Sequence, residues 1–273
     1  MVKIMKNNAI GVFDSGLGGL TAVSKLHELL PEENIIYFGD TARLPYGTRS
    51  RQTIVRYAKS DLAFLVSKGV KAVLVACGTV SSNAINELQA STDIPIVGVV
   101  EASADRACEV AMSGNGKVLL IGTSATVGSK KYEEYINSKY RGIEIISKAC
   151  PMFVPLVENK LRCGYSIKRM IAAEYLLEIA AQKPDAVILG CTHYILLADV
   201  LKELFYRSVL IDSGEEAAKR MKKTLETDGL ISPTEGKTEY YVSDGSEEFL
   251  GKASVFMQDD IKSVELIDIE NYN

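Results

Sequence analysis

Short apolar runs alternate with longer helical patterns along this chain, and this alternation constrains the fold more than any other feature. Most of the runs are continuously apolar, as expected of strands that are covered on both faces. Alternating strands and helices are typical of an α/β fold with largely parallel sheets. The expected strands are Ala9–Phe13, Ile35–Phe38, Ala72–Ala76, Ile96–Val99, Val118–Ile121, Ile143–Ser147, Ala186–Leu189 and Val209–Ile211, and the expected helices include Thr21–Leu30, Ser50–Lys68, Lys130–Lys139, Ser166–Ala180 and Glu215–Glu226.

Two of the expected strands end in the same way. Residues 72–77 (AVLVAC) resemble residues 186–191 (AVILGC), and a threonine follows each cysteine, as Thr79 or Thr192. A second echo links residues 12–16 (VFDSG) with residues 210–214 (LIDSG). Ligands bind outside the carboxyl ends of strands in open α/β sheets. The repetition therefore predicts two similar half-structures that present two thiols across one cleft.

Cys77 and Cys191 are the candidate proton carriers. A single cysteine at a strand end is more often a small core residue, but two at matching places favour catalysis. A free thiol has a pKa of about 8.5, which a helix N-terminus or a cationic neighbour lowers. Such a group can accept a proton as thiolate and return one as thiol near neutral pH. The pair therefore predicts an opposed acid and base.

Three further residues are candidates to support the thiols. His193 follows Cys191 by two residues and is placed to hold or accept its proton. Asp14 is a candidate for the same task beside Cys77. Glu158 follows an apolar run and would either orient His193 or lie at the surface as an ordinary carboxylate.

Composition and charge exclude several classes of site. The net charge is −4, and no run of Lys and Arg is long enough to form a nucleic-acid surface. No apolar run can cross a bilayer or form the core of a signal peptide, so a cytoplasmic location is expected. With five cysteines but no C-x-x-C pair, and only two histidines, free thiols are expected, without a disulfide framework or a zinc site. Cys108, Cys150 and Cys163 are expected to be structural, and His27 to lie at the surface.

Two glycine-containing loops follow expected strands. Residues 14–19 (DSGLGG) suit a small anion at the start of a helix, or form a tight turn without function. A dinucleotide fingerprint would need glycine at position 21, where Thr21 stands, so a nicotinamide cofactor is not expected. Residues 39–47 (GDTARLPYG) form a second long connection, which would either close over a ligand or serve as an ordinary loop.

Taken together, five segments resemble the glutamate racemase family. They are residues 10–20, 37–47, 122–126, 149–158 and 189–194, and the resemblance runs from about residue 9 to residue 273. It implies an α/β fold of two similar open, mainly parallel-sheet domains, related by a pseudo-twofold axis, with the active site in the cleft between them. One domain would comprise residues 1–97 plus 209–273 and carry Cys77. The other would comprise residues 98–208 and carry Cys191.

The resemblance also implies an activity and a set of site residues. The activity is the interconversion of L- and D-glutamate by two-cysteine acid/base catalysis, which needs no pyridoxal phosphate or metal and supplies D-glutamate for peptidoglycan. The implied partner is this small-molecule substrate, with no nucleic acid or membrane, and a homodimer stays open. The implied catalytic residues are Cys77, Cys191, Asp14, His193 and Glu158, and the implied substrate-binding residues are Asp14, Ser15, Pro45, Tyr46, Gly47, Gly78, Thr79, Thr123, Thr192 and His193.

Gly78 departs from the family pattern, which has asparagine directly after the first cysteine. The missing amide removes hydrogen bonds to the amino acid, each worth about 1 kcal/mol. Restoring it by Gly78→Asn is therefore predicted to be tolerated and to keep or lower KM for glutamate. Three alternatives stay open: an aspartate or other amino-acid racemase of the same superfamily, a hydrolase that uses Cys191 and His193, and a non-catalytic binding protein.

Overall fold

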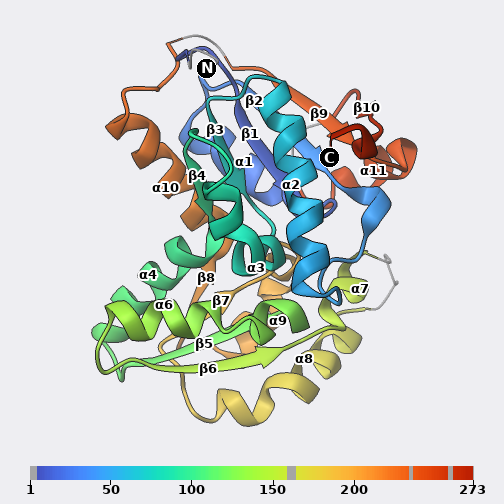
Figure 1. The fold of residues 1–273 in the computed structure, drawn as a ribbon. Coiled ribbons are helices and arrows are strands. Elements are labelled where there is room, and N and C mark those ends of the chain that lie inside the picture. Colours follow the sequence, from blue (N-terminus) through green and yellow to red (C-terminus); the bar gives the residue numbers. More distant parts are fainter. Residues whose placement is uncertain (1–4, 159–163, 234–235, 258–260, 273) are drawn as a thin grey trace.

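The computed structural model describes residues 5–158, 164–233, 236–257 and 261–272. They form two lobes, one above the other in Figure 1, and each lobe is built on its own parallel β-sheet. Both ends of the described chain lie in the first lobe, the upper one in this view. Within these ranges, no helix combines the length and the apolar character that crossing a bilayer requires.

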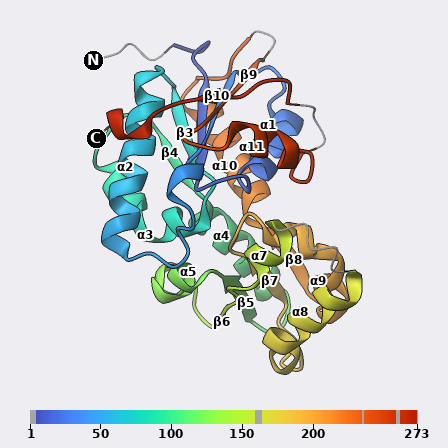
Figure 2. The ribbon, with the colours of Figure 1, turned by 90° about the vertical axis from the view of Figure 1, so that its right-hand side faces the viewer.

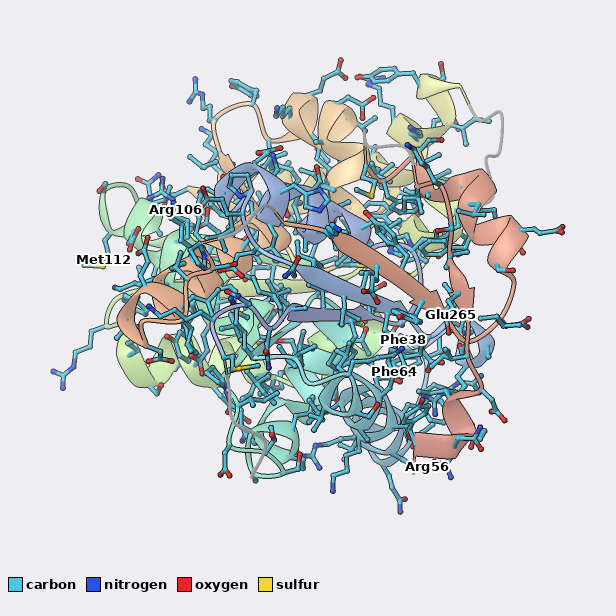
Figure 3. The ribbon with its side chains drawn as sticks, turned by 90° about the horizontal axis from the view of Figure 1, so that it is seen from above. Phe38, Arg56, Phe64, Arg106, Met112 and Glu265 are labelled. Atoms are coloured by element: carbon cyan, nitrogen blue, oxygen red, sulfur yellow. The ribbon has the colours of Figure 1, made fainter. Side chains whose placement is uncertain are left out.

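The first lobe contains a six-stranded sheet with helices on both faces. Its strand order is β10 (Glu265–Leu266), β9 (Thr238–Val242), β2 (Ile35–Gly39), β1 (Ile10–Asp14), β3 (Ala72–Val75) and β4 (Ile96–Gly98). One face packs against α1 (Leu20–Leu29), α10 (Ser213–Thr227) and α11 (Ser246–Ala253), and the other against α2 (Arg51–Ser67) and α3 (Gly78–Gln89). Phe38 of β2 and Phe64 of α2 lie close together in Figure 3, with ring centroids 5.1 Å apart.

The second lobe contains a four-stranded sheet that is covered in the same way. Its strand order is β6 (Glu144–Ala149), β5 (Lys117–Gly122), β7 (Ala186–Leu189) and β8 (Val209–Asp212). One face packs against α4 (Val99–Met112) and α6 (Lys131–Lys139), and the other against α7 (Phe153–Glu158), α8 (Tyr165–Ala180) and α9 (Ala198–Leu204). In Figure 2, α5 (Ser124–Gly128) and α7 lie at the level where the two lobes meet.

The apolar runs of the sequence form these strands because both faces of each sheet are buried. Side chains alternate between the two faces of a strand. In β5, Val118 and Leu120 belong to the core beside α4 and α6, whereas Leu119 and Ile121 belong to the core on the opposite face. The eight strands and five helices expected from the sequence are confirmed, with ends that differ by at most two residues.

The two sheets share a strand order. The order β2-β1-β3-β4 in the first lobe corresponds to β6-β5-β7-β8 in the second, and all of these pairs are parallel. Cys77 follows β3 and Cys191 follows β7, so the two cysteines occupy corresponding places. The similarity between residues 12–16 and residues 210–214 does not reflect corresponding strands, because Asp14 ends β1 whereas Asp212 ends β8. What these two share is a local turn, in which the carboxylate accepts a 2.9 Å hydrogen bond from the backbone N–H two residues later.

The structure differs from the expected boundary at residue 209. β8 pairs with β7, so residues 209–212 lie in the second sheet and the chain returns to the first lobe only with α10. Near residue 98 the chain passes from β4 of the first sheet into α4, which packs on the second sheet.

Candidate active site

A pocket of about 320 Å³ lies between the lobes, at the carboxyl ends of the central strands. The order reverses between β1 and β3, and between β5 and β7, which is where open α/β sheets bind ligands. The pocket brings together all the residues that the sequence singled out for catalysis or binding: Asp14, Ser15, Pro45, Tyr46, Gly47, Cys77, Gly78, Thr79, Thr123, Glu158, Cys191, Thr192 and His193. The lining is completed by residues that no sequence pattern marked individually as site residues: Leu44, Thr48, Ser124, Pro151, Val154 and Pro155.

Cys77 stands where β3 ends and α3 begins. It is the N-cap residue of α3 and is 5% exposed, with its Sγ 3.7 Å from the Ser15 hydroxyl. Burial and the nearby Asp14 carboxylate raise the pKa of the Cys77 thiol to about 12, although the Val80 N–H and the Ser15 hydroxyl favour the thiolate. Cys77 is therefore a protonated thiol at neutral pH in this arrangement.

Cys191, which follows β7 of the second lobe, begins a chain of polar contacts. Its Sγ lies 3.8 Å from His193 Nδ1, and His193 Nε2 lies 2.8 Å from Glu158 Oε1. Burial lowers the pKa of His193, but the hydrogen bonds to Cys191 and Glu158 outweigh it and raise this pKa to about 10. The contact with Glu158 answers the question left open by the sequence, because this carboxylate holds the imidazole and is not a free surface group.

Asp14 contributes a buried carboxylate at the end of β1. Its Oδ2 accepts a 2.9 Å hydrogen bond from the Gly16 N–H, while Oδ1 has no hydrogen-bond partner among the described residues. Burial raises the pKa of Asp14, partly offset by His193 and by the backbone N–H groups of Gly16 and Gly19. A buried acceptor without a partner is costly. Oδ1 is thus a ready acceptor for a ligand group in the pocket.

Hydroxyl groups from both lobes meet along one wall. The Thr79 and Thr123 hydroxyls are 2.9 Å apart, and they belong to α3 of the first lobe and the loop after β5 of the second. The Asn83 side chain also crosses between the lobes, donating a 3.2 Å hydrogen bond to the carbonyl of Ala125. Together with backbone N–H groups at the start of α3, these hydroxyls are suited to binding carboxylate oxygens.

Comparison with known proteins agrees with this geometry. The family described as Asp/Glu/Hydantoin racemase matches residues 10–221. The glutamate racemase of Chlorobium phaeobacteroides is 41% identical over 98% of both chains. The chain belongs to the glutamate racemase family. Solved structures of the family have the same fold: the Francisella tularensis enzyme in complex with D-glutamate (35% identity, TM-score 0.91, covering 98% of this chain and 100% of that chain) and a Bacillus anthracis isoform (32%, 0.92, 96% and 98%).

A buried ionic cluster holds the loop of residues 40–47, part of which lines the pocket of this glutamate racemase family member. The Tyr46 hydroxyl donates hydrogen bonds to Asp40 and Asp61, and Arg43 donates 2.6 and 2.7 Å hydrogen bonds to the same two carboxylates. Both aspartates are 0% exposed. Burial and the neighbouring Asp40 carboxylate raise the pKa of Asp61 well above its usual range. Asp40 and Arg43 lie inside one of the family-like segments, but no sequence signal marked Asp61 on α2.

Gly78, where the family has asparagine, leaves no room for a side chain. A Cβ built on Gly78 would lie 2.1 Å from the backbone oxygen of Gly190, which belongs to the other lobe. Backbone cannot give way as a flexible side chain does. The prediction that Gly78→Asn is tolerated is therefore wrong for this arrangement of the lobes.

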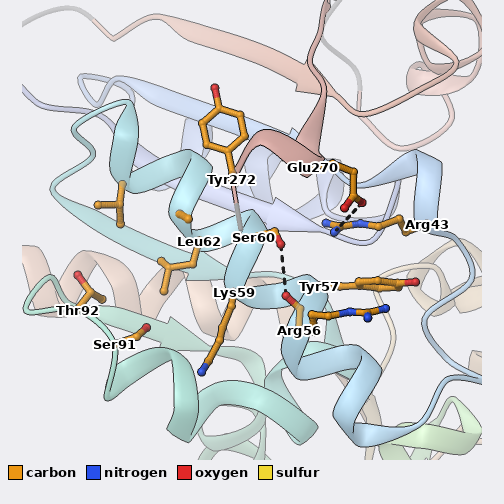
Figure 4. Close-up of a pocket in the computed structure, with 12 residues that line it drawn as sticks. Arg43, Arg56, Tyr57, Lys59, Ser60, Leu62, Ser91, Thr92, Glu270 and Tyr272 are labelled. Atoms are coloured by element: carbon orange, nitrogen blue, oxygen red, sulfur yellow. Dashed lines mark hydrogen bonds and ion pairs between the residues drawn. The ribbon is translucent and has the colours of Figure 1, made fainter.

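A larger hollow than this pocket lies elsewhere on the described surface. It has a volume of about 820 Å³ and lies between α2 and η3 (Ile269–Tyr272), and neither Cys77 nor Cys191 lines it (Figure 4). Two guanidinium groups lie over the Tyr57 ring, Arg43 at 4.4 Å and Arg56 at 5.2 Å from its centroid. Two residues that line the hollow also contact the surroundings of the active site: Arg43 binds Asp40 and Asp61, and the Tyr57 ring centroid lies 5.4 Å from that of Tyr46.

The remaining residues singled out by the sequence lie outside the pocket. Cys108 and Cys150 are buried in the second lobe, in agreement with a structural role, and Cys163 lies outside the described residues. His27 is half-buried, with its Nε2 2.8 Å from the Thr238 hydroxyl, so it is not the plain surface residue expected.

Proposed function

We propose that this chain interconverts L- and D-glutamate by proton transfer between the substrate, Cys77 and Cys191, without a cofactor. The observation that carries the proposal is the placement of the two thiols. They follow corresponding strands of two sheets and line one pocket. Inversion of a carbon centre without turning the substrate needs a base on one face and an acid on the other, and two opposed thiols meet that need.

In the proposed first step, Cys191 as thiolate takes the α-proton of the substrate. Cys77, whose pKa of about 12 keeps it protonated, then delivers its proton to the opposite face of the carbanion. The α-carbon has lost one proton and gained one, and the two cysteines have exchanged their protonation states. The reverse direction starts from this second state. His193, charged at neutral pH by its pKa of about 10, supports negative charge on the Cys191 sulfur.

The remaining lining residues are proposed to bind and orient the amino acid. The free Oδ1 of Asp14 would accept a hydrogen bond from the ammonium group, a role that gains weight because Gly78 has no side chain to offer. The hydroxyls of Ser15, Thr79, Thr123 and Thr192 and the N–H groups at the start of α3 would bind the two carboxylates. Donors fixed in advance around the α-carboxylate stabilise the charge that develops in the transition state. Pro45, Tyr46 and Gly47 would close the pocket.

We also propose a pathway and a cellular location for the reaction. The D-glutamate would supply peptidoglycan synthesis, the enzyme would act in the cytoplasm, and its partner would be the amino acid rather than nucleic acid or membrane. Whether two chains associate is measured directly by light scattering during size-exclusion chromatography.

The test is circular dichroism of purified, EDTA-dialysed protein with L- and D-glutamate in separate reactions, without pyridoxal phosphate. We expect both solutions to lose optical activity and to reach the same racemic end point. Activity that is lost on dialysis and restored by a metal ion contradicts the cofactor-free mechanism. Faster turnover of aspartate than of glutamate points to the related amino-acid racemase instead, and binding without exchange of the α-proton points to a non-catalytic protein.

A further inference from the structure

Three glycines of the first lobe touch the second lobe around the pocket. A Cβ on Gly78 would lie 2.1 Å from the Gly190 oxygen, and a Cβ on Gly18 would lie 2.1 Å from the Thr192 hydroxyl. A Cβ on Gly47 would lie 3.0 Å from Thr123 Cβ. All three positions follow the carboxyl ends of neighbouring strands, after β1 for Gly18, β2 for Gly47 and β3 for Gly78. We call these three residues the glycine seam.

Direct hydrogen bonds hold the lobes together along the same line. The Ala125 N–H of the second lobe donates a 3.0 Å hydrogen bond to the Gly47 carbonyl. The bonds from Asn83 to Ala125 and between Thr79 and Thr123 cross nearby. An added methyl group at Gly78 would meet backbone of the other lobe and press the lobes apart, which would strain these bonds, whereas at Gly18 and Gly47 it would meet side chains of the other lobe.

The contact at Gly78 lies between the residues that are bonded directly to the two cysteines. Gly78 directly follows Cys77, and Gly190 directly precedes Cys191. A backbone-to-backbone contact between these two glycines therefore fixes how far apart the two cysteines stand across the pocket. At Gly18 the contact is with Thr192 and His193, the residues that follow Cys191. The seam thus touches the surroundings of both thiols.

We infer that the glycine seam sets the distance to which the two lobes close, and that Gly78 is a positioning residue that sets the separation of Cys77 and Cys191. The part of the inference that concerns activity rests on the proposed racemase function. Proton transfer depends steeply on distance, and a misplacement of about 1 Å can cost roughly 10²-fold in rate. Asparagine at this position, the residue of the family pattern, would require a wider cleft than this chain has.

The experiment compares four single substitutions. Gly78→Ala, Gly18→Ala and Gly47→Ala place a methyl group in the seam, whereas Gly128→Ala in α5 is the matched control because a Cβ there would meet nothing within 4 Å. For each variant, kcat and KM are measured with both enantiomers. The rate at which iodoacetamide alkylates Cys77 and Cys191 is measured by peptide mass spectrometry without substrate, and the unfolding midpoint is measured by thermal melting.

We expect Gly78→Ala to lower kcat by roughly 10²-fold. It should also raise the alkylation rate of Cys77, which is 5% exposed in the closed arrangement, by about tenfold or more. Gly18→Ala should act in the same direction, less strongly, since side-chain atoms of Thr192 and His193 can move. Gly47→Ala should have the smallest effect of the three. Gly128→Ala should leave kcat and both alkylation rates at their wild-type values.

A second control separates closure from ordinary destabilisation. A Cβ on Gly98 would lie 2.4 Å from Ser81 Oγ, a clash that lies entirely within the first lobe. Gly98→Ala should lower the unfolding midpoint without raising the alkylation rate of Cys77. The seam is refuted if Gly78→Ala keeps wild-type kcat and wild-type thiol reactivity, or if Gly98→Ala exposes Cys77 to the same degree. Because alkylation needs no turnover, it tests the seam even if the wild-type protein fails to racemise glutamate.

Discussion

The two cysteines are chemically identical residues in corresponding places, but their surroundings differ. Cys77 is buried beside Asp14 at the start of α3, and burial raises the pKa of its thiol to about 12. Cys191 is more exposed and lies beside His193, which Glu158 holds in place. The free protein is thus prepared with the proton on Cys77.

Removal of either thiol should abolish net racemisation in both directions. We expect Cys77→Ala and Cys191→Ala each to lower kcat by roughly 10³-fold or more, because inversion needs one group to take the proton and another to return one. Chiral chromatography of both reactions measures the loss, and Cys108→Ala serves as the control that removes a thiol far from the pocket.

The same pair of variants separates the alternatives. A hydrolase that uses Cys191 and His193 would keep much of its activity in Cys77→Ala. In D₂O, the wild-type enzyme should place deuterium mainly in the enantiomer that is being formed. Equal early labelling of recovered substrate and product would refute the two-base mechanism.

The Glu158–His193 contact predicts a pH dependence. The folded-state pKa of His193 is raised to about 10 from an ordinary value of 6.5, so its protonation stabilises the fold fully below pH 6.5, and this stabilisation is lost as the pH rises through about 10. Glu158→Gln removes one of the groups that raise this pKa. The stability deficit of the variant should be largest near pH 6 and should narrow towards pH 10.

Thermal melting of both proteins across this pH range measures the deficit, and Glu174→Gln on the exposed part of α8 is a suitable control. A deficit that is constant from pH 6 to pH 10 would show that Glu158 does not act through the charge of His193.

At the scale of elements, the strands were predictable because their burial on both faces leaves a continuous apolar signature. β9 (Thr238–Val242) was not predicted as a strand, because it begins with the polar residues Thr238 and Glu239 and because Glu239 is exposed. It joins the sheet only through its in-register pairing with β2, a contact that spans some two hundred residues of sequence. β10 has two residues, too few to show any period.

Site residues were predictable where a reactive side chain directly follows a strand that the sequence already predicts. Each cysteine follows its strand directly, so Cys77 and Cys191 could be placed from the sequence alone. The cluster around Tyr46 shows the opposite case, because Asp61 reaches Arg43 from the middle of α2 and its role exists only in the folded chain. The clash at Gly78 likewise depends on how two lobes meet, which no local pattern encodes.

Arg43 donates hydrogen bonds to the buried side chains of Asp40 and Asp61, so its removal should be strongly destabilising. We expect Arg43→Ala to lower the free energy of unfolding by about 3–5 kcal/mol, the usual cost of stranding a buried charge, and to raise KM because Tyr46 loses its support. Asp61→Asn should be milder, since burial and the Asp40 carboxylate raise the pKa of Asp61 and so already penalise its charged form. Urea unfolding of both variants measures the difference, and equal losses would contradict this account.

At the scale of the whole molecule, the corresponding strand orders make each lobe a carrier of one thiol. Neither lobe alone offers an acid and a base on opposite faces of a substrate. The sequence predicts two domains with limits at residues 97 and 209, and the structure differs at the second limit, because β8 belongs to the second sheet. Under the inference above, the glycine seam makes the reaction rate depend on the distance between the two lobes.

Thermodynamics limits how far the unequal surroundings of the two thiols can make the two directions of the reaction differ. L- and D-glutamate are mirror images, so in water they have equal free energies and their equilibrium constant is one. The ratio kcat/KM must therefore be the same in both directions, however different Asp14 and His193 make the two sides of the pocket. The enantiomer with the lower KM must therefore have a kcat that is lower in the same proportion.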